Sequence, residues 1–307
     1  MNRSRASFAS SLLHLLFAAA VLAQSSPPDN AATPDASTAN NDVLRVGFWN
    51  VKWFPGGRPN AYKGEEVRQT KAVHADIAKL AADVIGVEEV RDWDSTALAV
   101  QPLPGFKVDV CSNFPAREGQ AVSQQVGIAS RLQPMSAWSE EWKAGGAIKP
   151  PRGFAFAAYE LAPRKILMFY AVHLKSNRGE LVENIAIREE STRQLIAHMR
   201  DMEAVYGKLG TLIWVVGGDF NTAPGDPRFQ TEKSATTLTQ NGFLWCWDGM
   251  PLEQRITMPP DSRFPAACFD HIFYRGGTLQ KAEALVTSNL SSDHRAIRAE
   301  FVLPSVR

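Results

Sequence analysis

The stretch Trp214–Asn221, which reads WVVGGDFN, decides how this sequence is interpreted. An apolar run ends in two glycines and is followed by an aspartate and an asparagine two residues apart. Because side chains alternate along an extended chain, Asp219 and Asn221 are predicted to point to the same side. The glycines let the backbone pass close to a bulky group, and we expect them to leave room for a phosphodiester. Such a strand end suits a hydrated metal or a phosphate, with a simple turn cap as the alternative.

Further apolar runs carry a carboxylate, an amide or an imidazole at one end. The groups concerned are Asn50, Glu88 with Glu89, His173 with Lys175, Asp270 with His271, and Asp293 with His294. Each group alone has a structural alternative: a solvated pair, a polar loop or a histidine satisfied within the core. Together they indicate one site of hard oxygen ligands, which favours magnesium, manganese or calcium over zinc.

The hydrophobic pattern predicts a mixture of strands and two helices. Strands are expected over 44–49, 84–87, 106–110, 125–130, 154–160, 166–172, 212–216, 269–274 and 297–303, and helices over 65–81 and 183–205. The strand runs are short and bounded by turn residues, whereas the helical runs repeat their apolar positions with a period near 3.6. Hairpin-spaced strands interrupted by two helices predict an α+β fold in which sheets carry helices on their outer faces.

The first 42 residues differ in composition and hydrophobic pattern from the rest. Arg3 and Arg5 precede an apolar run over 12–22 and small residues before Gln24, which is typical of a secretory signal peptide over residues 1–23. An uncleaved N-terminal anchor is the alternative. Residues 24–42 are rich in Ser, Pro, Ala, Thr and Asn and are predicted to be a disordered linker before a single domain over residues 43–307. We therefore expect a secreted or periplasmic protein without stable membrane insertion once the signal is removed.

Composition limits how the chain can recognise a partner. Without residues 1–23 it has 31 basic and 32 acidic residues, so it has no global field that attracts polyanions. Binding to a polyanion must therefore come from a local patch. Its three cysteines show no zinc spacing, and Cys246–Cys268 is the disulfide we expect because both residues flank strand-like segments.

The motifs at the strand ends resemble those of the endonuclease/exonuclease/phosphatase family, which contains deoxyribonuclease I and abasic-site endonucleases. The matching pieces occur in the family's order and span nearly all of residues 43–307. They are Trp49-Asn50-Val51, Gly86-Val87-Glu88-Glu89-Val90, Val172-His173-Leu174-Lys175-Ser176, Gly218-Asp219-Phe220-Asn221, Phe269-Asp270-His271 and Ser292-Asp293-His294. The resemblance implies a four-layer α/β/β/α sandwich of the deoxyribonuclease I type, with the site at one rim.

The resemblance also implies a divalent metal, with Mg²⁺ expected and Mn²⁺ or Ca²⁺ as alternatives. Glu89 would be the principal ligand, Asn50 would lie beside it, and Asp293 would contribute to a metal site or support this end. The metal would polarise a phosphoryl oxygen and stabilise the leaving oxygen. Two departures are visible. Glu88 stands where relatives often have glutamine, and either faces away or adds charge, and Lys52 replaces a frequent second oxygen ligand and offers a phosphate contact.

The catalytic roles implied by the resemblance fall on five residues. Asp219 would orient or deprotonate the attacking water, and Asn221 would hold the phosphate or that water. His294 would bind the phosphate and transfer a proton, with Asp270 accepting from its other ring nitrogen. His173 would bind the phosphate from the opposite side.

Further phosphate contacts are expected from Arg152, which enters a strand, and from Lys175 within the His173 motif. Arg188 on its helix is interpreted as solubilising charge. His271 is interpreted as structural, because adjacent strand residues face opposite sides.

The most specific functional prediction is a metal-dependent phosphodiesterase that acts as an endonuclease on DNA or RNA by water attack. The segment His173–Gly179 resembles secreted bacterial nucleases, and the sequence shows no exposed aromatic hairpin of the kind that inserts into lipid. A nucleic acid substrate and a monomeric protein are expected. A phosphatase or a sphingomyelinase-like lipid phosphodiesterase on the same residues remains an alternative, as does a non-catalytic binding protein.

Overall fold

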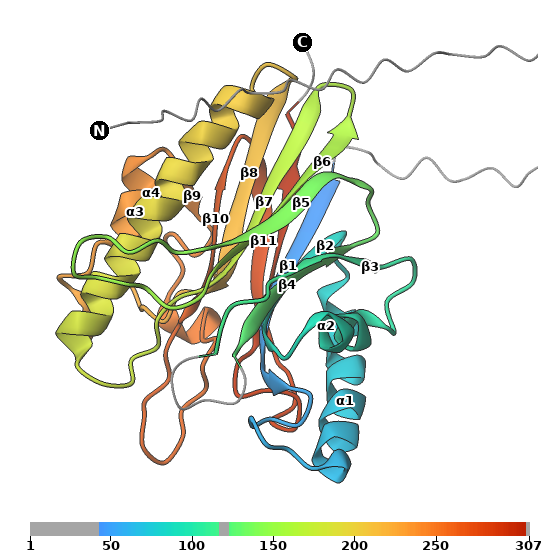
Figure 1. The fold of residues 1–307 in the computed structure, drawn as a ribbon, viewed down its shortest axis with the longest axis vertical. Coiled ribbons are helices and arrows are strands. Elements are labelled where there is room, and N and C mark those ends of the chain that lie inside the picture. Colours follow the sequence, from blue (N-terminus) through green and yellow to red (C-terminus); the bar gives the residue numbers. More distant parts are fainter. Residues whose placement is uncertain (1–42, 117–122, 305–307) are drawn as a thin grey trace, which may run out of the picture. The chain divides into compact units, whose positions relative to one another are not determined.

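Two six-stranded sheets lie face to face in the part of the chain that the computed structural model describes, residues 43–116 and 123–304 (Figure 1). The predicted signal peptide and linker lie outside the described residues. The first sheet runs in the order β11 (Thr278–Leu285), β12 (Ala296–Val302), β1 (Val43–Phe54), β2 (Val84–Val90), β4 (Gln125–Ser130) and β3 (Lys107–Cys111). The second runs in the order β5 (Pro134–Glu141), β6 (Gly153–Ala162), β7 (Lys165–His173), β8 (Thr211–Asp219), β10 (Asp270–Arg275) and β9 (Leu244–Trp245).

Helices cover the outer face of each sheet (Figure 1). The α-helices are α1 (Lys63–Ile77), α2 (Trp93–Val100), α3 (Leu181–Tyr206) and α4 (Ser234–Gln240), and short 3₁₀ turns are η1 (Ala78–Leu80), η2 (Pro227–Phe229) and η3 (Leu252–Gln254). Val73 and Ile77 of α1 share an apolar cluster with the first sheet, and Leu195 and Met199 of α3 share one with the second. The expected α/β/β/α sandwich is therefore confirmed.

Within the apolar cluster between the sheets, one large aromatic ring packs against two glycines. Phe48 of β1 stacks on Phe169 of β7 with 4.8 Å between ring centroids. A Cβ atom added at Gly86 or Gly217 would lie 2.5 Å from the Phe48 ring. Gly218, at φ +125°, passes against the Val172 carbonyl and the Glu88 carboxyl. The bulky group expected beside the glycines is thus a core side chain, and the expectation that they leave room for a phosphodiester is wrong.

Every strand and helix expected from periodicity is present, with ends shifted by a few residues. The pattern missed α2, α4 and the strands β5, β9 and β11. Strands β5 and β11 are edge strands and are largely half-buried or exposed, so their sequences lack a strong apolar alternation. Helices α2 and α4 have only 8 and 7 residues, too few for a clear helical period.

The predicted Cys246–Cys268 disulfide is wrong for this structure, because all three cysteines are free thiols. Cys246 and Cys268 are both buried in the cluster between the sheets, where they pack as small apolar groups. No helix among the described residues is both long enough and apolar enough to cross a bilayer.

Candidate active site

Strand pairing brings three predicted residues into one row at the rim of the second sheet. In the parallel pair β7–β8, His173 lies opposite Asp219, and in the antiparallel pair β8–β10, Asp270 lies opposite the same Asp219. The first sheet contributes Asn50 of β1, and His294 comes from the turn before β12. Residues that are far apart in the sequence therefore meet because five strands end at the same rim.

Asp219 is the centre of the site. Its Oδ2 accepts a hydrogen bond from Asn50 Nδ2 at 3.0 Å and lies 3.6 Å from His173 Nε2 and 3.8 Å from His294 Nε2. Its Oδ1 accepts from the Asn221 backbone N–H at 2.8 Å. Burial is the main cause that raises the pKa of Asp219 to about 7, and the positive charge of His294 opposes the rise. A carboxyl group tuned in this way can exchange a proton near neutral pH.

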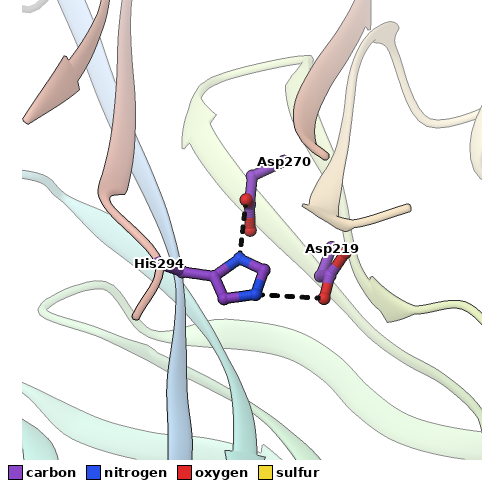
Figure 2. Close-up of side chains that lie close together, drawn as sticks. All are labelled: Asp219, Asp270 and His294. Atoms are coloured by element: carbon purple, nitrogen blue, oxygen red, sulfur yellow. Dashed lines mark hydrogen bonds and ion pairs between the residues drawn. The ribbon is translucent and has the colours of Figure 1, made fainter. Parts of the chain in front are cut away.

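His294 is held between two carboxyl groups (Figure 2). Its Nδ1 lies 2.8 Å from Asp270 Oδ2, and its Nε2 faces Asp219. The backbone is fixed as well, because the His294 carbonyl accepts from Trp49 Nε1 at 3.0 Å. Burial alone would lower the pKa of His294, but the carboxylates of Asp270 and Asp219 outweigh it and raise that pKa well above its usual value. The imidazolium is therefore the favoured form, with its Nε2–H directed into the site.

Glu89 presents its carboxylate from a bulge in β2. The register of β2 with β4 shifts between Glu88 and Val90, and Glu89 has φ +62°. Its Oε1 accepts from Asn50 Nδ2 at 3.1 Å and its Oε2 accepts from the Trp53 backbone N–H at 3.1 Å. The side chain is 14% exposed, compared with 2% for Asp219. The bulge therefore turns Glu89 outward, where it can reach a ligand.

Backbone conformations that are unfavourable for residues with a side chain gather at this site. Lys52, Trp53, Glu89, Arg152 and Asn221 all have φ between +47° and +66°, and all line one groove. Left-handed conformations of this kind tend to persist where the surrounding structure enforces them, typically at functional sites.

The donor set fits a divalent cation. Glu88, Glu89, Asp219 and Asp270 bring four carboxyl groups to a region with two imidazoles, and among the described residues both Glu88 oxygens and Asp270 Oδ1 are buried without a hydrogen-bond partner. This excess of acidic groups is what a divalent metal compensates. Glu89 is the carboxylate that opens toward the groove. The Asn50 amide turns its nitrogen toward Glu89 while its oxygen accepts from the Lys52 N–H at 3.0 Å, so coordination by Asn50 requires rotation of that amide.

A second grouping with metal-ligand spacing consists of Asp219, Asp270 and His294, whose ligand atoms lie within 4.8 Å of one another. One nitrogen of His294 is already occupied by Asp270, and the favoured imidazolium has no lone pair to offer. The geometry of this grouping therefore suits proton and phosphate handling better than metal binding, whereas the Glu89 carboxylate is open to a ligand.

Glu88 is a carboxyl group buried beneath the site. It is fully buried on the inner face of β2, and its Oε1 lies 2.8 Å from the position of a Cβ added at Gly218. Burial, followed by the nearby carboxylates of Asp270 and Asp219, raises the pKa of Glu88 well above its usual value. The neutral acid is therefore the favoured form of Glu88, so the structure does not support the interpretation in which Glu88 adds negative charge to the site.

Lys52 and Asp293 form an ion pair at the mouth of the site, with 2.9 Å between Lys52 Nζ and Asp293 Oδ2. The two side chains are 42% and 45% exposed. Burial of Asp293 would raise its pKa, but the charges of His294 and Lys52 hold that pKa below its usual value. Lys52, which was predicted to contact phosphate, and Asp293, which was predicted to contribute to a metal site, are therefore bound to each other in this structure.

Arg152 and Lys175 line the groove and also brace the loop after β7. Arg152 Nε donates to the His173 carbonyl at 2.9 Å and Nη2 donates to the Leu174 carbonyl at 2.6 Å. Lys175 Nζ donates to the carbonyls of Ser176 and Arg178, both at 2.8 Å. Arg152 therefore holds the backbone of His173 in place, and Lys175 holds the loop that follows it.

Arg188 is not the solubilising residue that the sequence indicated. It is fully buried, donates to both oxygens of Glu232 at 2.8 and 2.6 Å, and donates to Asn177 Oδ1 at 3.0 Å. Asn177 Nδ2 in turn donates to the Asn221 carbonyl at 2.9 Å. Helix periodicity carried the missed signal, since Arg188 shares an inner face with Leu195 seven residues later.

The site opens into a groove of about 1140 Å³. Met258, Phe264 and Pro265 form one apolar part of its lining, and Phe264 is 59% exposed. Met258 and Ala267 pair as an antiparallel bridge, so these residues belong to a hairpin. The protein therefore carries an exposed aromatic hairpin that turn residues on both sides of Phe264 concealed in the sequence, whereas the expectation concerned only hairpins that insert into lipid.

Solved structures of other proteins share this fold. An endonuclease/exonuclease/phosphatase family protein from Bacteroides thetaiotaomicron is 16% identical with a TM-score of 0.62, covering 86% of this chain and 99% of that one. A mannosyl-6-phosphatase from the same organism is 16% identical with a TM-score of 0.62, covering 85% and 100%. Truncated TDP2 from Caenorhabditis elegans is 18% identical with a TM-score of 0.59, covering 85% and 98%.

A search of the curated proteins found no match. The family model described as Endonuclease/Exonuclease/phosphatase family matches residues 47–294, which contain every site residue predicted above. The family match supports a phosphoesterase, and enzymes of this family generally use divalent metals. The chain belongs to the endonuclease/exonuclease/phosphatase family.

Proposed function

We propose that the protein is a secreted or periplasmic, metal-dependent endonuclease that hydrolyses phosphodiester bonds of DNA or RNA. One observation carries the proposal. The Asp219 carboxyl group, with its raised pKa, faces Asn50, His173 and His294 in a groove larger than a typical small-molecule pocket.

The side chains divide the work of water attack. Asp219 orients a water molecule and accepts its proton as the water oxygen bonds to phosphorus and the leaving oxygen departs. Nε2–H of His294 donates to the phosphate and can supply a proton, while Asp270 stabilises the positive ring through Nδ1. His173 holds the phosphate from the β7 side. A divalent metal on Glu89 would polarise a phosphoryl oxygen and reduce the charge that develops on the leaving oxygen.

The groove favours an extended anionic substrate. Lysine and arginine side chains outnumber acidic ones among its lining residues, seven to five. The cationic residues besides Lys52 are Lys149, Arg152, Lys175, Arg178, Arg228 and Arg263. A local strip of positive charge can bind a polyphosphodiester even though the whole chain is nearly neutral. A phosphomonoester would occupy only a small part of this groove.

Two other activities use the same residues. The structural likeness to a mannosyl-6-phosphatase keeps a phosphatase as one candidate, and the exposed Phe264 keeps a lipid phosphodiesterase as the other. A non-catalytic binding protein is less consistent with a complete and convergent set of acidic groups and imidazoles.

Hydrolysis assays with plasmid DNA, RNA, sphingomyelin and phosphomonoesters test the proposal when each is run with Mg²⁺, Mn²⁺ or Ca²⁺ and with chelator. We expect nicking of plasmid DNA or cleavage of RNA that chelator abolishes. Sphingomyelin or phosphomonoester hydrolysis without nucleic acid cleavage would contradict the nuclease assignment.

Substitution of Glu89 tests the metal assignment. Glu89→Ala should raise the metal concentration needed for half-maximal activity, whereas Glu253→Ala, an exposed residue outside the groove lining, should leave it unchanged. Equal metal dependence in the two variants would remove Glu89 from the metal site.

Export and assembly are tested separately. Cell fractionation should place the protein outside the cytoplasm, and sequencing of its N-terminus should begin at Gln24. Light scattering of the exported protein should give the mass of a monomer. An uncleaved N-terminus in the membrane fraction would favour the anchor alternative.

A further inference from the structure

The hairpin over residues 258–267 is built as a rigid arm. At its base, Met258 and Ala267 exchange two backbone hydrogen bonds of 2.9 Å. At its tip, the Asp261 N–H donates to the Phe264 carbonyl at 3.0 Å, and Asp261 Oδ1 accepts from the N–H groups of Arg263 and Phe264 at 2.7 and 2.8 Å. The tip is therefore ordered by its own backbone, although Phe264 is 59% exposed.

The arm is fastened to the catalytic residues. Thr257, which precedes it, accepts through Oγ1 from the Asp270 N–H at 3.1 Å and through its carbonyl from the Arg295 N–H at 2.7 Å. Asp270 and Arg295, which follows His294, are thus both hydrogen-bonded to Thr257, the residue that leads into the hairpin. Phe264 and Arg263 line the same groove as Asp219. The base of the hairpin is therefore hydrogen-bonded to the segments that carry Asp270 and His294.

The chemistry of the tip suits a nucleobase better than a lipid. Phe264 offers an exposed ring, and the Arg263 guanidinium lies 5.5 Å from its centroid. An aromatic ring stacks on any base, and an adjacent arginine can bind the neighbouring phosphate or stack as well. Insertion into a bilayer would instead bury Asp261 and Arg263 together with a single aromatic ring, at a large desolvation cost.

We propose that Phe264 and Arg263 form a base-stacking platform that makes the enzyme prefer single-stranded nucleic acid. This inference rests on the proposed nuclease function. The faces of bases in a duplex are covered by their neighbours, whereas an unpaired nucleotide beside the scissile phosphate can place its base on Phe264. The preference is therefore for single strands over duplexes of the same sequence.

Steady-state cleavage of a single-stranded oligonucleotide, the same sequence as a duplex, and a strand of abasic sugars tests the platform. Phe264→Ala should lower kcat/KM about ten-fold on the base-containing single strand, in line with the loss of one base–aromatic contact. Its kcat/KM on the abasic strand should equal that of the wild type. Phe264→Trp should retain wild-type activity, and Trp93→Ala, which removes an aromatic ring that is 50% exposed on α2, should change nothing.

The outcomes separate this inference from the proposed function. If the wild-type protein cleaves none of the strands, the nuclease assignment fails. If it cleaves them and Phe264→Ala matches it on all three, only the platform is refuted. An equal loss on the abasic strand, or a loss confined to binding of sphingomyelin vesicles, would also overturn the platform. Thermal unfolding should give the same Tm for Phe264→Ala and the wild type, since the ring is exposed.

Discussion

Among the charged side chains that are buried in the described part of the chain, two groups differ in how completely their polar atoms are paired. The Arg188 pair, formed by Arg188 and Glu232, has side chains that are 0% and 1% exposed, and the guanidinium meets both carboxylate oxygens. In the acidic cluster, formed by Glu88, Asp219 and Asp270 around His294, both oxygens of Glu88 and one of Asp270 lack a hydrogen-bond partner among the described residues.

This difference distinguishes a buried ion pair with a structural role from buried acidic groups that are available for catalysis. A buried ion pair whose donors and acceptors are satisfied holds the chain in one arrangement, and the Arg188 pair does so for the loop that contacts Asn221. A buried carboxylate without a partner lowers stability, so its persistence indicates another use. The acidic cluster retains oxygen atoms that are unpaired within the described residues, and a metal, a proton or a phosphate that interacts with the cluster during the reaction can compensate for them.

The largest expected effect is on kcat and comes from a substitution at the centre of the acidic cluster. Asp219→Asn should lower kcat by about 10³-fold, because the amide cannot accept the proton of water, while KM changes little. Single-turnover and steady-state assays measure both constants. The exposed Asp248→Asn should leave both unchanged. An active Asp219→Asn enzyme would contradict the water-activating role.

The next largest effect is on stability and comes from breaking the Arg188 pair. Arg188→Met leaves Glu232 buried without its partner and should lower the free energy of unfolding by about 3–5 kcal/mol. The matched change Arg193→Met, in the same helix, removes a pair whose arginine is 63% exposed and should cost less than about 1 kcal/mol. Denaturant titration distinguishes them. Equal losses of unfolding free energy in the two variants would show that the buried pair contributes no more to stability than the exposed one.

A third prediction concerns His271, which lies next to the acidic cluster but is fully paired. Its Nε2 lies 2.9 Å from the Thr222 carbonyl and its Nδ1 lies 3.2 Å from Trp245 Nε1, a pattern that fixes the neutral ring. Burial lowers the pKa of His271 to about 4. The unfolded chain therefore binds this proton first as pH falls from about 6.5 to about 4, and stability decreases by up to about 3 kcal/mol.

Denaturant titrations at several pH values check the His271 prediction. His271→Gln should remove much of the decrease between neutral and acidic pH. His74→Gln, on the partly exposed surface of α1, should keep it. A decrease that is identical in the wild type and in His271→Gln would assign the acid sensitivity to other groups.

The smallest effect tests the unpaired member of the acidic cluster. Glu88→Gln replaces a buried carboxyl group with a neutral amide of the same shape and should raise the free energy of unfolding at neutral pH by about 1–3 kcal/mol, measured with chelator present. The exposed Glu253→Gln should have no effect. A stability loss in Glu88→Gln would mean that the carboxylate has a partner that these contacts do not reveal.

Much of the fold followed from local pattern, and part of the site did as well. Strands such as β4 and helices such as α3 have clear periodicity, so their positions were predicted within a few residues. The predicted residues Asn50, Glu89, His173, Asp219 and His294 do meet. Helix periodicity places Arg188 on the inner face of α3, but the sequence could not identify its partner, because Glu232 lies 44 residues away.

The platform residue Phe264 was concealed for a related reason. Its segment carries no periodic signal, and exposure of a side chain is a property of the folded surface rather than of local sequence.

By itself, the sequence determined the family, the α+β class and the identity of the groups that meet at the rim, because apolar periodicity and short motifs are local properties. Only the tertiary structure decided how those groups share charge. It placed Glu88 under the site, paired Lys52 with Asp293, and used Gly217 to admit the Phe48 ring rather than a phosphodiester. These outcomes depend on distances between residues that are remote in sequence, and electrostatic and packing energies depend on those distances.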